Sequence, residues 1–395
     1  MTRVLVMIPS GEVYGRDNVR WYQHHDIQRS INSYHNIGDA FVFDSSLKLL
    51  SYDKLGVLEI SAFNPDLVDR LRDEYDYVFL RGSNYIHNSM NWEQAVPILK
   101  RLGLPIIGFG IGAQAPSKGK IQLSNQSHEL LHLMADSTTS IGVRGRYTAQ
   151  VLWDIGIRNT RIIGCPTAFR RNDPELRIKL PPLDNVRKVG ITIRREVSAD
   201  YAKDIKRYLT FHRDLVKTMA RRFDAVLMAQ GEVEEKKLVL GTEAQRGDAM
   251  DALRAHPWAA SWYLDEQMVR LYRERLFYSD VVADYEELVR SLDLVLGYRL
   301  HGNLMALANG TPSIYFTYDS RTVEFAETFQ IPSFDVFSAK EFRLDEYFDQ
   351  PRFDQYNCSW RHIYGEMHRF LTENGVAHRM IDTGNTSGTS IRKIA

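Results

Sequence analysis

Short runs of β-branched and aliphatic residues recur along the chain. Each is followed by a glycine-rich or polar turn and then by a longer stretch with helical spacing. This alternation is typical of βα units around a parallel sheet. In the first half it predicts strands at residues 4–8, 57–60, 77–80, 106–109, 140–143 and 161–163. Further along it predicts strands at residues 189–193, 225–228, 281–283, 294–296 and 313–316.

Three prolines among charged residues interrupt this rhythm between residues 171 and 188, a composition typical of a linker. We therefore predict an α/β protein with two tandem Rossmann-like domains, at residues 1–172 and 189–381. A linker at 173–188 joins them, and a polar tail at 382–395 is expected to be flexible. Two such domains place ligands in the cleft between them, at the carboxyl ends of the strands.

Composition narrows the class of protein. The chain has 395 residues, of which 44% are hydrophobic, enough for sizeable buried cores. Its 50 Lys and Arg residues balance 50 Asp and Glu residues, and this zero net charge argues against a nucleic-acid partner. Cys165 and Cys358 are too few for a disulfide scaffold. No apolar run has the length of a signal peptide or a spanning helix, so we expect a cytoplasmic protein.

The strongest candidate site is the Gly-Tyr-Arg-Leu-His-Gly sequence at residues 297–302, which follows a predicted strand and opens a helix. Unpaired N–H groups and the helix dipole favour an anion there. Arg299 and His301 would complete a pocket for phosphate or carboxylate. The alternative is that Arg299 pairs with a local acid and His301 only caps the helix. Neither position has the pattern of a core residue, so replacing either is expected to leave the fold intact.

Further arginines follow two other predicted strands. Arg194 and Arg195 come directly after the first strand of the second domain, and Arg144 and Arg146 hold an equivalent place in the first domain. We expect both pairs to face the cleft. The alternatives are that Arg194 and Arg195 are two solvated charges, and that one arginine of the other pair only fixes the first turn of its helix.

One motif indicates a different class of protein. Residues 128–132 read His-Glu-Leu-Leu-His, and His128 and His132 on one helix face could hold zinc with Glu129 as base. The leucines and Met134 should form the buried stripe, which leaves the histidines on the solvated side. Further zinc ligands are missing downstream, so we expect no metal. The glycines of residues 108–112 lack the dinucleotide spacing, and we expect no nicotinamide cofactor.

A long loop between residues 10 and 36 is rich in aromatic side chains, among them Trp21, Tyr22 and Tyr34. Aromatic rings with hydrogen-bonding edges suit a sugar, whose apolar face stacks while its hydroxyls bond outward. The alternative is a loop that buries its own aromatic residues.

Taken in order, several short motifs resemble the polysaccharide pyruvyl transferase family. They lie at residues 36–39, 108–112, 141–147, 299–301, 310–312 and 318–319. The resemblance implies a fold similar to the two-domain glycosyltransferase-B type. It also implies transfer of pyruvate from phosphoenolpyruvate onto two hydroxyls of a sugar, with formation of a cyclic ketal and release of phosphate. The chain departs from the family pattern at Arg321, where lysine is more frequent, at Ser83, where glycine is common, and in the long loop before Asn36.

The resemblance, and the chemistry that this reaction needs, suggest roles for individual residues. Arg299, Leu300, Arg194 and Arg144 would bind phosphoenolpyruvate, a trianion that guanidinium groups match at both its carboxylate and its phosphate. His301, with an ordinary pKa near 6.5, would donate a proton. Asp39 would deprotonate the sugar, with Glu232 as second choice. The sugar would contact Trp21, Tyr22, Tyr34 and Glu232. Phosphoenolpyruvate is a co-substrate, and the scheme requires neither a cofactor nor a metal.

The acceptor implied by the resemblance is a sugar, an oligosaccharide or a lipid-linked saccharide, the last of which would bring the protein to a membrane surface. Two alternatives remain open. An inverting glycosyltransferase that uses a nucleotide sugar would employ the same fold and cleft, although Glu324 and Glu327 lack the E-x₇-E spacing of many such enzymes. A non-catalytic sugar-binding protein would keep the aromatic loop and release no phosphate.

Overall fold

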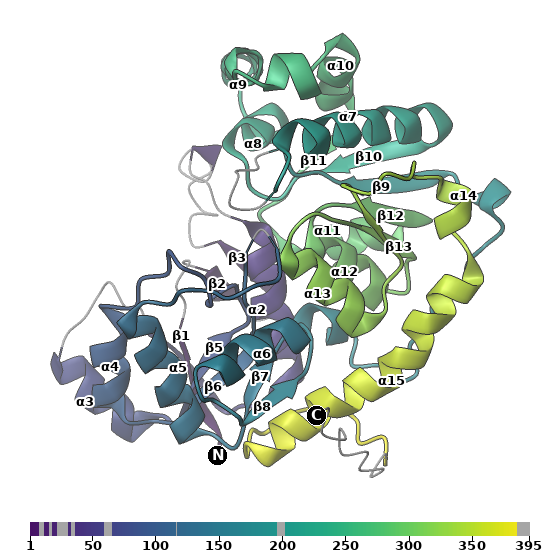
Figure 1. Ribbon diagram of the computed structural model, residues 1–395. Helices are drawn as coiled ribbons and strands as arrows, with labels where there is room; N and C mark the ends of the chain where they lie inside the picture. The colour runs from purple at the N-terminus through teal and green to yellow at the C-terminus, as the bar shows by residue number, and fades with distance from the viewer. Residues whose placement is uncertain are drawn as a thin grey trace.

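Two parallel β-sheets with helices packed around them form the two halves of the molecule (Figure 1). The structure is a computed structural model that describes residues 1–7, 12–15, 18–21, 31–32, 36–58, 65–115, 117–195 and 202–384, with the backbone alone at 12–15 and 18–21. The predicted α/β class with two parallel sheets is confirmed.

The first sheet has the strand order β4-β1-β5-β6-β7-β8. Every residue of β5 and β6 is buried, as expected for central strands of a parallel sheet covered on both faces. The strands are β1 (Arg3–Met7), β4 (Lys54–Leu58), β5 (Tyr77–Arg81), β6 (Ile106–Ile111), β7 (Ile141–Val143) and β8 (Thr160–Ile162). The helices of this half are α2 (Ile37–Leu49), α3 (Pro65–Glu74), α4 (Ala95–Leu102), α5 (Asn125–Ser137) and α6 (Arg146–Asp154).

The second sheet has the order β11-β10-β9-β12-β13-β14, which is the 3-2-1-4-5-6 order of a doubly wound fold. Its strands are β9 (Lys188–Thr192), β10 (Asp224–Met228), β11 (Leu276–Phe277), β12 (Leu294–Gly297), β13 (Ser313–Thr317) and β14 (Ser333–Asp335). The helices are α7 (Ile205–Arg222), α8 (Val233–Leu240), α9 (Glu243–Ala255), α10 (Glu266–Arg275), α11 (Val282–Arg290), α12 (Leu300–Ala308), α13 (Ser320–Phe329), α14 (Leu344–Tyr347) and α15 (Gln350–Glu373). Among the described residues, none of the helices combines the length and the apolar character that crossing a membrane requires.

The strand predictions are confirmed in both halves, with bounds that differ by up to a few residues, except at residues 281–283, where the prediction is wrong. Residues 8, 59 and 60 of two predicted strands lie outside the described residues. Val281 is the N-cap of α11, and the buried residues Val282, Tyr285 and Val289 recur at helical spacing, so the valines belong to a helix face. The pattern also missed the short strands β11 and β14. Within the segment predicted as a long loop, β2 (Glu12–Gly15) and β3 (Asn18–Trp21) form an antiparallel hairpin.

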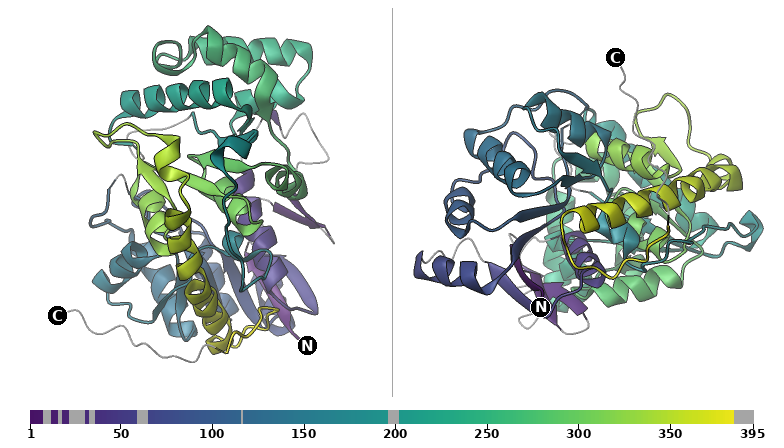
Figure 2. Two further views of the ribbon diagram at one scale, coloured as in Figure 1. Left: turned by 90° about the vertical axis from the view of Figure 1, so that its right-hand side faces the viewer. Right: turned by 90° about the horizontal axis from the view of Figure 1, so that it is seen from below.

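The last long helix, α15, reaches from the second half of the molecule back to the first (Figures 1 and 2). Near its end, Glu366 and Glu373 pair with Arg161 of β8 at 2.6 and 2.5 Å. Nearer its start, Asn357 bonds the backbone of Ile178 between the two sheets. The domain boundary at 173–188 stays a prediction, and residues 385–395 of the expected tail lie outside the described residues.

A buried ion-pair network also joins the two halves. Arg170, which follows β8, contacts Asp44 of α2 at 3.0 Å and Glu286 of α11 at 2.5 Å. The side chains of Arg170 and Asp44 are at most 5% exposed. Because losing one member would leave an uncompensated buried charge, this network fixes α2 against the second half of the molecule.

Candidate active site

In each sheet the strand order reverses at one point, and the loops that follow the strands at these two points lie in one region of the molecule. The order reverses between β1 and β5 in the first sheet and between β9 and β12 in the second. Ligands of doubly wound sheets bind at such points, beyond the carboxyl ends of the strands. Arg81 ends β5, Arg194 follows β9, and Arg299 follows β12. The backbone N–H of Ile37 donates to the carbonyl of Gln230 at 2.8 Å, so the start of α2 lies against the second half.

Two helix N-termini meet at this place. Asn36 caps α2 and accepts a hydrogen bond from the N–H of Gly38, while Arg299 occupies the N-cap of α12. A Cβ atom added to Gly38 would lie 3.0 Å from Nδ1 of His301, so glycine lets the imidazole approach the helix closely. The motif at residues 36–39 and the Arg-Leu-His sequence, 260 positions apart, are therefore neighbours in space.

His301 is buried and lies in a positive electrostatic field. Its Nε2 atom is buried, and within the described residues it has no hydrogen-bond partner. The pKa of His301 is well below its usual value, first because of burial and then because of four guanidinium groups. In order of effect these belong to Arg144, Arg321, Arg81 and Arg299, which we call the arginine group. The imidazole is therefore neutral at pH 7 and faces a potential that attracts an anion.

Carboxylates on neighbouring loops and at the start of α2 hold three of these arginines. Glu232 forms a buried ion pair with Arg299, whose Nε also donates to the carbonyl of Ile193 at 3.0 Å. The other two contacts are longer, at 3.6 Å between Arg81 and Asp39 and 3.4 Å between Arg321 and Asp319.

Arg144 is held mainly by neutral groups. It is 1% exposed, its Nε donates to the carbonyl of Gly110 at 3.2 Å, and its Nη1 donates to Oδ1 of Asn84. A Cβ on Gly112 would lie 2.4 Å from its Cδ, so that glycine makes room for the side chain. Burial lowers the pKa of Arg144 to about 10, which leaves it charged at neutral pH.

The loop after Arg144 is fixed by a carboxylate from the other half. Glu324 of α13 accepts from the backbone N–H of Thr148 at 2.6 Å and from its hydroxyl at 2.9 Å. It thereby caps the first turn of α6, which has no side-chain cap of its own. Burial raises the pKa of Glu324. Contact between the halves thus sets the start of the helix that follows Arg144.

The other arginines that follow predicted strands have different surroundings. Arg194 is partly buried, donates to the Tyr318 hydroxyl at 2.6 Å and lies over its ring. The same hydroxyl accepts from Arg321 at 2.9 Å, which joins Arg194 to the group around His301. The expectation that Arg195 faces the cleft is wrong, because it is buried against Glu234 and Glu235. Arg146 is exposed.

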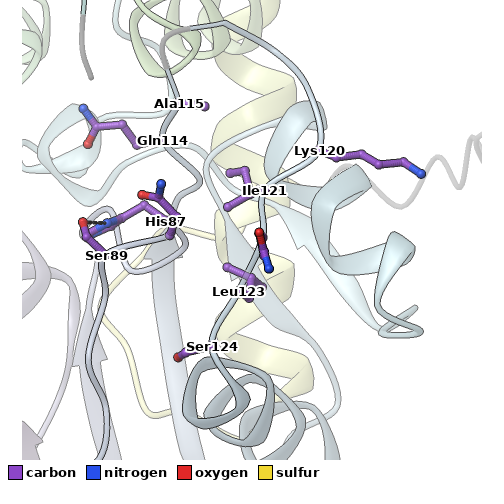
Figure 3. A pocket seen from close by; sticks show the side chains of 10 residues that line it. His87, Ser89, Gln114, Ala115, Lys120, Ile121, Leu123 and Ser124 are labelled. Atoms are coloured by element: carbon purple, nitrogen blue, oxygen red, sulfur yellow. Dashed lines mark hydrogen bonds between the residues drawn. The ribbon is translucent and has the colours of Figure 1, made fainter. Parts of the chain in front are cut away.

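A cavity of about 690 Å³ lies beside this group, lined by residues 87–89, 114–115 and 120–124 (Figure 3). Gln114 in its wall accepts from Asn84 at 2.5 Å and donates to Asp319 at 3.4 Å. Because Asn84 also accepts from Arg144, two consecutive hydrogen bonds connect Gln114 in the cavity wall to Arg144.

The predicted acceptor contacts have different outcomes. Tyr22 and Tyr34 lie outside the described residues, and Trp21 ends β3 with only its backbone described. Glu232 is 3% exposed and its carboxylate is committed to Arg299. The alternative prediction that Arg299 pairs with a local acid is therefore confirmed. Leu300, at the first position of α12, is buried and accepts from the Tyr315 hydroxyl through its carbonyl.

Sequence reasoning assigned no site role to Arg81, Arg321, Asn84, Gln114 or Gln230. Arg81 carried a usable signal, because it is a charged residue that ends a fully apolar strand and precedes glycine. Gln230 and Asn84 stand in turns after β10 and β5, where position alone does not separate them from other polar turn residues.

The candidate zinc motif lies on α5, away from the residues just described. Leu130, Leu131 and Met134 are buried as predicted, His132 is exposed, and Glu129 pairs with Lys100. Among the described residues, no three His, Cys, Asp or Glu side chains are grouped to hold a metal ion.

Residues 36–320 match the family described as polysaccharide pyruvyl transferase. The chain belongs to this family. Its match covers the motif at 36–39, the reversal point of the second sheet and the Arg-Leu-His sequence. A search of curated proteins finds no match.

Solved structures similar to this chain have low sequence identity. The MnaA–UDP structure from S. aureus is 12% identical, with a TM-score of 0.41, and the match covers 97% of this chain and 100% of that one. Alr3699/HepE from Anabaena, in complex with UDP and glucose, is 11% identical, with a TM-score of 0.44 and coverage of 95% and 98%. A UDP-GlcNAc 2-epimerase from Methanocaldococcus jannaschii is 10% identical, with a TM-score of 0.43 and coverage of 94% and 99%.

The burial of Arg299 corrects the expectation that its replacement leaves the fold intact. Arg299→Ala would leave the Glu232 carboxylate, which is 3% exposed, without its counter-ion. We expect the free energy of unfolding to fall by about 3–5 kcal/mol, measured by urea denaturation. The matched control is Arg146→Ala, an exposed arginine expected to change stability by less than about 0.5 kcal/mol. Equal stability of Arg299→Ala and the wild type would show that the pair does not support the fold.

Proposed function

We propose that this protein transfers pyruvate from phosphoenolpyruvate onto two hydroxyls of a sugar in a polysaccharide or its precursor, forming a cyclic ketal and releasing phosphate. The observation that carries the proposal is the buried Nε2 of His301, which has no partner in the described structure and lies in the field of four arginines. A buried polar atom without a partner at this edge of the two sheets can bind a ligand, and the positive field favours an anionic one. Membership of the pyruvyl transferase family supports the same reading.

The donor would bind between the two helix N-termini. Phosphoenolpyruvate carries a carboxylate and a phosphate, and planar guanidinium groups bind both with paired hydrogen bonds. Arg144, Arg299 and Arg321 are the groups we assign to it, with Arg194 joined to them through Tyr318. Because their carboxylate partners and carbonyl contacts already fix them, little ordering is needed when the donor binds.

His301 is the group we assign to proton donation. It is neutral in the free protein, and the negative charge of the bound donor would raise its pKa so that the imidazole gains a proton. That proton passes to the methylene carbon, and the adjacent carbon becomes the electrophile that the first sugar hydroxyl attacks. The bond from that carbon to the phosphate oxygen then breaks, phosphate leaves, and the second hydroxyl closes the ketal. General acid help of this kind is typically worth ~10² to 10⁴ in rate.

Two hydroxyl protons must leave during the reaction. One replaces the proton that His301 gives to carbon, and the other departs with hydrogen phosphate, so charge balances. Asp39 is our candidate for accepting the first of them. It is partly exposed at the start of α2 and lies 3.6 Å from Arg81, within the group that surrounds His301. Glu232 is the weaker candidate, since its carboxylate is paired with Arg299.

Ligand-induced stabilisation tests the donor. Phosphoenolpyruvate should raise the melting temperature, because a ligand at 100 times its Kd stabilises the folded state by about 2.7 kcal/mol. UDP-sugars at equal concentration should not. Stabilisation by UDP-sugars alone, with release of UDP in the presence of an acceptor, would indicate a glycosyltransferase instead. Sugar binding without release of either phosphate or UDP would indicate a non-catalytic protein.

Proton uptake tests the assignment of His301. The pKa of His301 is low in the free protein and higher in the donor complex, so between the two values binding takes up a proton. Across that window affinity falls as pH rises, by up to tenfold per pH unit, and it is flat below the lower pKa. Calorimetry in two buffers of different ionisation enthalpy measures the uptake. In His301→Gln, the proton uptake that comes from titration of the donor itself should remain, and the uptake that comes from the imidazole should be lost. Identical uptake in both proteins would contradict the assignment.

A further inference from the structure

The cavity beside the arginine group presents neutral hydrogen-bonding groups. Its lining includes the carboxamides of Asn88, Gln114 and Gln122 and the hydroxyl of Ser89, and it contains no carboxylate. Lys120 is exposed, and Figure 3 shows its side chain directed away from the other labelled residues. His87 in the wall bonds Ser89 through Nδ1 at 2.9 Å, and burial lowers its pKa, so it carries no charge at neutral pH.

The cavity wall is held in place by backbone contacts between the loops after β5 and β6. The N–H of Gly112 donates to the carbonyl of Ser83 at 2.9 Å, and the N–H of Gln114 donates to that of Ile86 at 3.0 Å. Ile86 and Ala113 also form a parallel bridge. This side of the cavity is therefore preformed, and binding there requires little ordering of the main chain.

Gln114 connects the cavity to the second half of the molecule through its hydrogen bond to Asp319, whose neighbour Ser320 accepts from the N–H of Ala115 at 2.9 Å. A ligand in the cavity would therefore lie next to the residues that hold Arg321. The amides of Asn88 and Gln122 make no hydrogen bond within the described part of the chain and are available to a ligand.

We propose that this cavity binds the acceptor and selects a neutral saccharide over an acidic one. Carboxamides both donate and accept, as sugar hydroxyls do, while Ile121 and Leu123 offer apolar surface to the ring. A volume of about 690 Å³ falls within the usual range for small-molecule sites and exceeds the need of a single water. A uronic acid would bring a carboxylate to a wall whose one cationic side chain among the described lining residues, Lys120, is directed away from the others (Figure 3). This inference rests on the proposed function.

The test uses the full chain with saturating phosphoenolpyruvate and a panel of neutral methyl hexosides and disaccharides, each beside its uronic acid. Phosphate release gives the KM of each sugar. The double variant Asn88→Ala/Gln122→Ala removes two exposed amides without touching the core. At about 0.5–1.5 kcal/mol per hydrogen bond, it should raise the KM for the neutral sugar about tenfold. The KM for phosphoenolpyruvate should stay within twofold. Gln355→Ala, an exposed amide of α15, is the matched control and should change neither.

Two kinetic results would overturn the inference: an unchanged acceptor KM in the double variant, or a uronic acid used with a lower KM than its neutral counterpart. Saturation-transfer NMR of the same sugars gives a second reading that does not need turnover. Neutral sugars should show contact with the wild type, and the contact should weaken in Ser89→Trp, which places an indole at the cavity wall. Absence of such contact with any neutral sugar also overturns the inference. Failure of phosphoenolpyruvate to stabilise the wild type would instead refute the proposed function, and the NMR result would still decide the cavity.

Discussion

The structure depends on guanidinium groups buried around a neutral imidazole. Water cannot stabilise these charges where they lie, so each must be held by a carboxylate, a carbonyl or an amide. The partners stand on different elements: Glu232 after β10, Asn84 after β5, and Asp319 at the start of α13. Each of these pairs lies within one half, and the assembled halves bring Arg81 and Arg144 of the first half together with Arg299 and Arg321 of the second around His301. The anion site is therefore a property of the contact between the two sheets.

The partners hold the arginines without cancelling their field at His301. All four electrostatic effects on that imidazole come from arginines, which lower its pKa in addition to burial. If these residues served only the stability of the fold, carboxylates would neutralise the positive field or the imidazole would lie in solvent. Retaining a buried, neutral base in a positive field suits a group that must gain a proton only when an anion arrives.

Much of the fold could be predicted from the sequence, because buried parallel strands are apolar runs and their turns are rich in glycine. The exceptions have physical reasons. Residues 281–283 have the composition of a strand, but their apolar positions continue at helical spacing into α11. Strand β11 has two residues, too few to show a period.

The candidate site was predictable in part. Arg299, His301, Arg144 and Asp39 lie in one region, as strand-end residues of two doubly wound sheets should. The prediction that Arg299 and His301 lie outside the core was wrong, and the sequence carried a signal against it, because α12 is apolar at most of its positions, a pattern typical of a buried helix. The sequence could not pair Glu232 with Arg299 or Glu324 with Thr148, since these contacts join separate elements and, for Glu324, separate halves.

Transfer of pyruvate to a sugar by the arginine group and His301 is tested most directly by following the labelled carbon of [2-¹³C]phosphoenolpyruvate by NMR during turnover with the best neutral acceptor. We expect the label to appear in a quaternary ketal carbon bonded to two sugar oxygens, with one phosphate released per ketal. Label found only in free pyruvate or in unreacted phosphoenolpyruvate would contradict it.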